Sequence, residues 1–261
     1  MFADVSAKSI EETRAQQLRR SIVNELFEGY LVNRQHDVLY HHMLKGIDLK
    51  RNNNAIPGIA LCSVKRTDQS KSSDREAFMK AIVSVVNRIN CIVLNHRLFV
   101  IAIRDKIRVG IKLTEEENKK FQLICLFYQS NDIGALLEKI GPVSVSLAVA
   151  QASLESGFGS NEILHRNNAF FGMMMDKTRL YSFDTLFESV IAYVKTLNVH
   201  PCYRQFRLER NKMLASAQKI DGTKLVRYLG KYAEKKNYRS ILSKMIECYN
   251  LHLLDRAYKN V

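Results

Sequence analysis

The sequence predicts a mainly α-helical protein with one small β-hairpin, and three observations lead to this prediction. From Phe78 to Ile103, apolar residues recur at alternating steps of four and three, which is the spacing of a long helix with a coiled-coil-like seam. Capping boxes at Ser9–Glu12 and Thr114–Glu117 mark the starts of two other helices. The segment 140–161 is apolar nearly all round, so it should form a helix at the centre of the fold.

The first 73 residues divide into a helical segment, 1–50, and a polar linker, 51–73. After the first capping box, helical spacing runs through Leu18, Ile22, Leu26 and Tyr30, and we expect this helix to continue into the early forties. The linker is rich in Asn, Ser, Pro and Gly and is longer than most loops of a compact domain.

Residues 74–139 should form a helical support region. The long seam contains His96, which we interpret as a hydrogen-bonded core histidine because ligands or catalytic bases are uncommon at such positions. In the helix that begins at Thr114, four side chains should face the core: Phe121, Ile124, Cys125 and Tyr128.

Residues 140–261 are predicted as a second unit. Gly141–Pro142 should open the central helix, because proline is tolerated at the first helical position. Residues 169–183 fit a short hairpin that turns near Asp176, and Asp184 should cap the following helix. Pro201 should help to open the next helix, and further helices are expected over 225–229 and 238–253.

Composition and charge limit the classes of partner. With 46% apolar and 25% charged residues the chain is an ordinary globular protein, and its net charge of +14 is spread over both halves. Residues 195–244 carry 13 basic against 3 acidic residues, a field that would attract a polyanion, although solvated helix faces explain it equally well. No zinc-finger spacing or RNA-binding signature accompanies the charge, so no nucleic-acid partner is expected. No transmembrane segment is predicted, because polar residues interrupt the most apolar run, 89–103.

The cysteines predict neither a metal site nor a disulfide framework. Five of them are scattered without Cys-x-x-Cys pairs or histidines at zinc spacing, and we expect them to be buried as small apolar residues. No metal and no cofactor are therefore expected. The N-terminus lacks the charged, apolar and cleavage regions of a complete secretory signal.

Glu155 is the most informative single residue. It is the one charged side chain between Ile140 and Asn161, and two glycines, Gly157 and Gly159, follow it. A carboxyl group with an apolar helix behind it should resist ionising, as a general acid requires. The alternative is an exposed glutamate at the end of a helix that the glycines terminate.

Four blocks resemble the bacterial glucosaminidase family (mannosyl-glycoprotein endo-beta-N-acetylglucosaminidase-like) and, within it, the Bax-like proteins. They are 150–159 around Glu155, the 168–172 turn, 183–193, and 231–238. The segment 197–207 looks specifically Bax-like. Phe158 stands where the family usually has Trp, and Ala169 where a second Asn is common.

The resemblance implies a lysozyme-like arrangement of helices with a small β-hairpin lobe, in a peptidoglycan hydrolase that works in the periplasm or cell envelope. Glu155 would protonate the leaving oxygen of a glycosidic bond. Tyr232 and Tyr238 would lie across the cleft from it. The second group could be the carboxylate of Asp176 or Glu188, with a structural role favoured for Glu188, or the substrate's own acetamido group. Substrate contacts are expected from six residues: Gln151, Ser156, Phe158, Asn168, Phe170 and Tyr181.

Three kinds of function remain open. The first is an endo-β-N-acetylglucosaminidase that uses Glu155. The second is another activity on the same polymer, as a muramidase, a lytic transglycosylase or an amidase. The third is a non-catalytic wall-binding or interaction protein that retains the fold.

Overall fold

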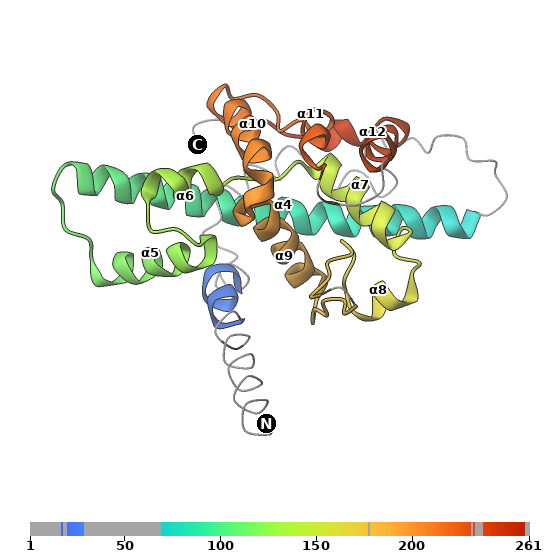
Figure 1. Cartoon of the computed structure of the whole chain (residues 1–261), viewed down its shortest axis with the longest axis horizontal. Coiled ribbons are helices and arrows are strands. Elements are labelled where there is room, and N and C mark those ends of the chain that lie inside the picture. Colours follow the sequence, from blue (N-terminus) through green and yellow to red (C-terminus); the bar gives the residue numbers. More distant parts are fainter. Residues whose placement is uncertain are drawn as a thin grey trace, which may run out of the picture.

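The computed structural model of the chain describes residues 17, 20–28, 69–176, 178–230, 232 and 237–258, with the side chains of residues 28 and 69–73 excepted. These residues are mainly helical, as the sequence predicts (Figure 1). Three predictions lie largely outside them: the Ser9–Glu12 capping box, the run of the first helix into the early forties, and the linker up to residue 68.

Helix α4, Gln69–Arg108, runs along the longest axis of the molecule and the other helices pack around it (Figure 1). Its predicted seam is confirmed, because Ile82, Ile89 and Ile92 are almost completely buried. The prediction that residues 69–73 end the linker is wrong, since α4 starts at Gln69. A polar stretch is as compatible with the first turn of a helix as with a loop.

Helix α4 is, within the part of the chain that the structure describes, the one helix long and apolar enough to cross a membrane, over Asp74–Arg108. Half of its most apolar window is buried inside the protein, as in the core helix of a folded domain. Length and composition alone are therefore a weak argument for a membrane span, and the absence of a transmembrane segment stays a prediction.

His96 on α4 is a core histidine, as predicted. Its Nδ1 lies 3.2 Å from the Tyr128 hydroxyl and its Nε2 lies 3.3 Å from the Leu26 carbonyl oxygen. Burial lowers the pKa of His96 to about 3, against the hydrogen bond to Leu26, which raises it. The neutral ring thus joins α4, α5 and the segment that contains the short helix η1, Asn24–Glu28.

Helices α5, Glu115–Tyr128, and α6, Ile133–Lys139, cover one end of α4 (Figure 1). The predicted capping box is confirmed: the Glu117 amide donates to the Thr114 hydroxyl, and the Thr114 amide donates to the Glu117 carboxylate. The predicted inward face is also present, with Ile124, Cys125 and Tyr128 buried and Phe121 half-buried.

Helix α7, Val145–Ser156, is the central helix that the sequence predicts. It packs against α4, α11 (Gly222–Leu225), α12 (Tyr238–Cys248) and the short helix η4 (Leu251–Leu254). Of its residues only Leu154 and Glu155 are not fully buried. The predicted start at Gly141–Pro142 is wrong, because Ser144 is the N-cap and its hydroxyl accepts the Leu147 amide. A hydroxyl that satisfies a free amide determines where the helix begins, and proline only tolerates that position.

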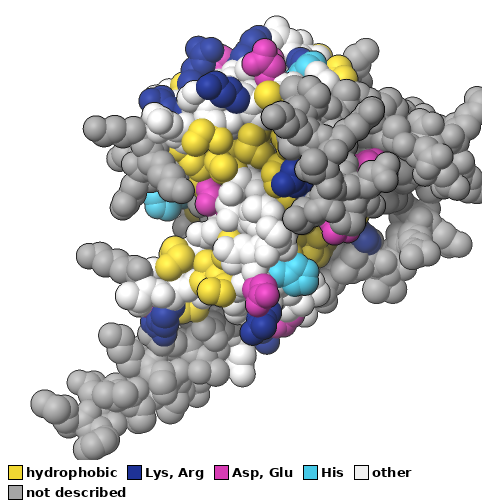
Figure 2. Space-filling view, turned by 90° about the vertical axis from the view of Figure 1, so that its right-hand side faces the viewer, with side chains coloured by type: hydrophobic (Ala, Val, Ile, Leu, Met, Phe, Trp, Pro, Cys, Tyr) yellow, Lys and Arg dark blue, Asp and Glu magenta, His cyan; other side chains and the backbone are white. Residues whose placement is uncertain are grey.

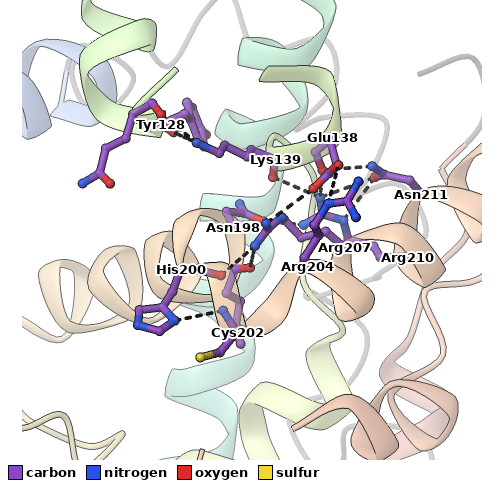
Figure 3. A network of polar contacts seen from close by, with 12 residues as sticks. Tyr128, Glu138, Lys139, Asn198, His200, Cys202, Arg204, Arg207, Arg210 and Asn211 are labelled. Atoms are coloured by element: carbon purple, nitrogen blue, oxygen red, sulfur yellow. Dashed lines mark hydrogen bonds and ion pairs between the residues drawn. The ribbon is translucent and has the colours of Figure 1, made fainter. Parts of the chain in front are cut away.

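Buried Arg210 holds the chain that leads into α7 (Figure 3). Its guanidinium donates to the carbonyl oxygens of Gly141 at 3.1 Å and of Glu138 and Lys139 at 3.0 Å, and also to the Asn198 side chain. A β-carbon at position 141 would lie 2.6 Å from the guanidinium carbon, so any other residue there would displace the Arg210 side chain. Burial, with Arg97 and Arg207 nearby, lowers the pKa of Arg210 to about 9.

Two of the basic residues in the 195–244 field therefore serve the fold. Arg210 is fully buried, and Arg207 is 3% exposed, donates to the His200 carbonyl oxygen at 2.9 Å and pairs with Glu138 at 3.4 Å. The solvent-facing excess of positive charge is smaller than the sequence count indicates.

Asp255 fixes the start of α7 from the other side. Its carboxylate accepts hydrogen bonds from the Ser144 and Ser146 hydroxyls at 2.8 and 2.6 Å and from the Ser146 and Gly222 amides at 3.0 and 2.9 Å. An acidic group at a helix N-terminus is favourable because the free amides point toward it. The end of the chain's described part is thereby attached to the central helix.

Between α8, Glu162–Arg166, and α9, Leu186–Val199, the chain turns beneath α7 (Figure 1). No strands form here among the described residues, and the predicted hairpin is reduced to a single antiparallel bridge between Met174 and Leu180. The Asp176 side chain closes the turn so tightly that few residues remain to pair. The predicted cap of α9 is also wrong, because Thr185, not Asp184, is the N-cap.

Of the remaining helices, α10, Arg204–Ala215, runs across α4 in Figure 1, and α11 and α12 lie above it. Pro201 opens the short helix η2, Pro201–Tyr203, which leads into α10, as predicted. The predicted helices near the end correspond to four elements: α11, Gly222–Leu225; η3, Val226–Tyr228; α12, Tyr238–Cys248; and η4, Leu251–Leu254.

Four of the five cysteines lie among the described residues: Cys91, Cys125, Cys202 and Cys248. Cys91 and Cys125 are buried, as expected. The expectation of burial is wrong for Cys202 and Cys248, which are exposed.

Candidate active site at the end of helix α7

Glu155 lies in the last turn of α7, where its side chain is half-buried. Gly157 ends the helix in the left-handed conformation, with φ of 58°, so the chain turns away directly after the carboxylate. This placement differs from that of a fully exposed glutamate at a helix end, because neighbouring segments cover part of the side chain.

The 168–172 turn covers one side of Glu155. A β-carbon built at Gly172 would lie 3.1 Å from Glu155 Oε2 and 3.6 Å from its Cβ and Cδ. Gly172 also has a backbone φ of +61°, which residues other than glycine rarely adopt. Two of the sequence blocks are thus in direct contact, and the contact requires a glycine.

Tyr238, the first residue of α12, covers another side of the carboxylate. It is 4% exposed, and its hydroxyl oxygen accepts a hydrogen bond from Gln151 Nε2 at 3.1 Å. Burial raises the pKa of Tyr238, the negative charge of Glu155 raises it further, and a hydrogen bond to the Glu155 carboxylate adds to the increase. The hydroxyl therefore keeps its proton and can donate it in a hydrogen bond to Glu155.

Tyr232 lies beside Tyr238. The two rings stack with centroids 5.8 Å apart and planes at 12°, and the Tyr232 hydroxyl donates to the Phe171 carbonyl oxygen at 3.0 Å. Burial raises the pKa of Tyr232, and the charges of Tyr193, Tyr238 and Glu155 add to this. The structure thus brings Glu155 together with both late tyrosines that the sequence selected.

Gln151 lies one turn before Glu155 on α7 and is completely buried. Its Oε1 accepts a hydrogen bond from the Tyr193 hydroxyl at 2.8 Å, while its Nε2 donates to Tyr238. Both ends of the amide are bound to tyrosines, so the structure places Gln151 beneath the site and not on its surface.

Asp176, the first candidate for the second catalytic carboxylate, makes its hydrogen bonds within its own turn. Asp176 is exposed, and its oxygens accept from the Thr178 and Arg179 amides at 2.9 and 2.8 Å and from the Arg179 side chain at 2.6 Å. These hydrogen bonds, that from Thr178 first, hold the pKa of Asp176 well below its usual value. Its charge is used to close its own turn.

Glu188 has the structural position that the sequence favoured. Its amide donates to the Thr185 hydroxyl at 3.2 Å, and its carboxylate accepts the Asp184 amide at 3.0 Å. These contacts form the N-terminal cap of α9.

The aromatic candidates for sugar contacts lie in different surroundings. Phe158 is half-buried, packs against Tyr249 with centroids 5.6 Å apart, and has the Arg75 guanidinium 5.1 Å from its ring centre. Phe170 is 7% exposed and packs against Phe78 in the core. Tyr181 is half-buried beside Phe183 on the turn.

The two small polar candidates make local contacts. The Asn168 side-chain amide donates to the Phe183 and Asp184 carbonyl oxygens at 2.9 and 3.2 Å. The Ser156 hydroxyl donates to the Ala152 carbonyl oxygen and accepts the Gly159 amide, which closes the end of α7. Both therefore shape the loops around Glu155.

The sequence did not single out Tyr193, which donates a hydrogen bond to Gln151, or Gly172, which lies against Glu155. Tyr193 looked like one more apolar residue of α9, although a buried tyrosine usually needs a hydrogen-bond partner for its hydroxyl. The signal for Gly172 was its place in the 168–172 block, but the distance to Glu155 required the fold.

The molecular end that carries α7 and α8 is shown as a surface in Figure 2. Apolar side chains are exposed there next to uncharged polar atoms and scattered charged groups. Ile163 on α8 is an apolar side chain that is 68% exposed. Across the described ranges, no group of three or more His, Cys, Asp or Glu side chains is placed to hold a metal ion.

Residues 132–251 match the family model described as mannosyl-glycoprotein endo-beta-N-acetylglucosaminidase. Over 123 residues the chain is 34% identical to protein bax of Escherichia coli strain K12. This aligned region covers 43% of this chain and 45% of that protein. The chain thus spans less than half of that relative's length. No solved structure matches the chain.

The matched region contains α7 with Glu155 and both late tyrosines, Tyr232 and Tyr238, and it is similar to a glucosaminidase domain. Over this region, which is less than half of its length, the chain resembles the Bax-like glucosaminidase-domain proteins.

Proposed function

We propose that the domain is an endo-β-N-acetylglucosaminidase that hydrolyses the glycan strands of peptidoglycan, with Glu155 as the general acid. The observation that carries this proposal is the gathering of Glu155, Tyr232 and Tyr238 at the end of α7, inside the region that matches the glucosaminidase family. The family supports the class of substrate, and the geometry supports the choice of residue.

Glycosidic cleavage passes through a state in which positive charge develops at the sugar carbon, so the leaving oxygen must receive a proton. Glu155 is suited to supply it, because it is half-buried at the end of an apolar helix while part of its side chain still reaches solvent. A positioned general acid contributes about 10²–10⁴-fold in rate.

The group that attacks the sugar carbon is proposed to be the substrate's own 2-acetamido oxygen. Asp176 uses its oxygens to close its own turn, and Glu188 uses its carboxylate to cap α9. In a substrate-assisted reaction the acetamido oxygen bonds to the sugar carbon as the leaving oxygen departs with the proton of Glu155. Water then attacks the same carbon, breaks its bond to the acetamido oxygen and returns a proton to the Glu155 carboxylate. Tyr232 and Tyr238 would orient the acetamido group beside Glu155.

The same proposal assigns the partner and the place of action. Peptidoglycan glycan strands are the substrate, and the protein would act in the periplasm or cell envelope, where this polymer lies. Phe158 and Tyr181 are the half-buried aromatic side chains offered to sugar faces, and the proposed reaction uses no metal or cofactor.

The test is digestion of purified peptidoglycan by the wild type and by Glu155→Gln, with the new chain ends identified by mass spectrometry. The wild type should release strands with reducing N-acetylglucosamine ends, and Glu155→Gln should be slower by about 10²-fold or more. Glu162→Gln is the matched control: the same change at an exposed glutamate of α8, which pairs with Arg166 across a helix turn. It should keep full activity.

Other ends would replace this proposal with a named alternative. Reducing muramic ends indicate a muramidase, anhydromuramic ends a lytic transglycosylase, and intact released peptides an amidase. Binding to the polymer without digestion by the wild type would identify a non-catalytic wall-binding protein.

A further inference from the structure

The amide of Gln151 is the best-defined polar contact beneath the proposed site. The side chain is completely buried, so water does not reach it, and each of its hydrogen-bonding atoms is matched to one tyrosine. Tyr193 from α9 donates to Oε1 at 2.8 Å, and Nε2 donates to Tyr238 from α12 at 3.1 Å. Three helices thus meet at one amide.

These contacts fix the direction of the Tyr238 hydroxyl. A tyrosine hydroxyl has one hydrogen to donate, and its oxygen can accept. Since the Tyr238 oxygen accepts from Gln151, its own hydrogen is available to the Glu155 carboxylate, with which it interacts. The hydrogen bonds then run in one direction, from Tyr193 through Gln151 and Tyr238 to Glu155, and each polarises the next.

Tyr193 decides which way the amide is turned. An amide can exchange its oxygen and nitrogen by rotation, and the pattern of donors around it selects one orientation. Without the Tyr193 hydroxyl, the buried Oε1 would have no donor, which is unfavourable. If the amide turned over, Oε1 would accept the hydrogen of Tyr238, that hydrogen would leave Glu155, and Nε2 would be the atom without a partner. Without the Tyr193 hydroxyl, neither orientation of the amide is therefore selected.

We propose that Gln151 and Tyr193 are positioning residues, which act on Glu155 by keeping the Tyr238 hydroxyl directed at its carboxylate. This inference rests on the proposed role of Glu155 as the general acid. When Glu155 has given its proton to the leaving oxygen, the hydroxyl stabilises the carboxylate that remains, and so favours the transfer.

Tyr193→Phe is the decisive variant, because it removes one hydroxyl and keeps the ring, which stacks on Phe171 with centroids 4.0 Å apart. The expected result is a fall in kcat of about tenfold with KM unchanged, as for a group that acts on the chemical step. The alkaline limb of the pH profile of kcat should also move to higher pH. A hydrogen bond to a carboxylate favours its ionised form, so without it the acid keeps its proton longer.

Tyr203→Phe is the control, since Tyr203 is a buried tyrosine of the same aromatic group whose ring contacts Tyr232. It should leave kcat and the pH profile unchanged. A double-variant cycle adds a readout that a packing role would not move. In a Tyr238→Phe background, Tyr193→Phe should cause no further loss, because no hydroxyl is left to direct.

A measurement without turnover separates this inference from the proposed function. In ¹⁵N-labelled protein, the Gln151 side-chain amide should give protons that exchange slowly with water in the wild type and in Tyr203→Phe, and faster in Tyr193→Phe. Additive losses in the cycle, or an unchanged amide signal with unchanged kcat in Tyr193→Phe, would overturn the relay while Glu155→Gln still decides the function. If Glu155→Gln remains active, the proposed function fails, and the amide signal still reports whether Tyr193 orients Gln151.

Discussion

Replacing Gly172 by alanine tests the contact between the 168–172 turn and Glu155. The backbone at position 172 has φ of +61°, and a side chain in this left-handed region costs roughly 1–2 kcal/mol. The added methyl carbon would lie 3.1 Å from Glu155 Oε2, closer than an ordinary contact by a few tenths of an ångström. The carboxylate must therefore move, the turn must shift, or both.

The two consequences can be measured separately. Stability should fall by about 1–2 kcal/mol in urea unfolding. Glycan cleavage should fall by about tenfold or more, since small displacements of a catalytic group are costly and a shift of 1 Å can remove about 10²-fold. Wild-type activity in a folded Gly172→Ala variant would refute the claim that Glu155 must occupy its observed position.

Gly110→Ala is the matched control for this prediction. Gly110, in the turn after α4, also has a left-handed φ, +75°, but a β-carbon there would meet nothing within 4 Å. The variant should lose a similar stability and keep its activity. If both variants lose activity equally, backbone strain explains the effect and contact with Glu155 does not.

Three further predictions concern other residues. Stability should decrease as the pH falls below 6.5 toward about 3, because the folded protein buries His96 in its neutral form while the unfolded chain binds a proton there. The loss of stability between pH 6.5 and 5 amounts to about 2 kcal/mol. His96→Gln should lack this part of the pH dependence when unfolding in urea is measured. Arg210→Lys should cost about 3 kcal/mol, since lysine cannot reach the same set of buried carbonyl oxygens, whereas Arg204→Lys at an exposed position should change stability by less than about 0.5 kcal/mol. Asp176→Asn should keep glycan cleavage within about threefold of the wild type, and a loss of about 10²-fold would instead assign Asp176 a part in the chemistry.

The sequence predicted those parts of the fold that depend on periodicity and local capping. The seam of α4 and the capping box at Thr114 follow from patterns within one helix, and the apolar surface of α7 required a central position. His96 was placed correctly because a histidine on an apolar seam must be satisfied inside the core.

Predictions failed where contacts between distant segments decide the structure. The start of α7 depends on Ser144, whose hydroxyl also contacts Asp255 from the far end of the chain. The start predicted from Pro142 was therefore wrong. The hairpin was overestimated because the Asp176 side chain, and not a ladder of backbone pairs, closes the turn.

The candidate site was predicted in its residues but not in its arrangement. Glu155, Tyr232 and Tyr238 were selected from sequence blocks, and the structure brings them together. The hydrogen bonds from Tyr193 through Gln151 to Tyr238 were not predicted, because they join three helices and no sequence spacing indicates such contacts.

The most direct test of Glu155 as proton donor compares two substrates that differ in their need for a proton. Glu155→Gln is assayed on a β-1,4-linked glycan and on the matching dinitrophenyl glycoside, whose leaving group departs without protonation. If Glu155 is the proton donor, we expect a loss of about 10²–10⁴-fold on the glycan and a far smaller loss on the dinitrophenyl glycoside. Equal losses on both substrates, or no loss on the glycan, would contradict this role.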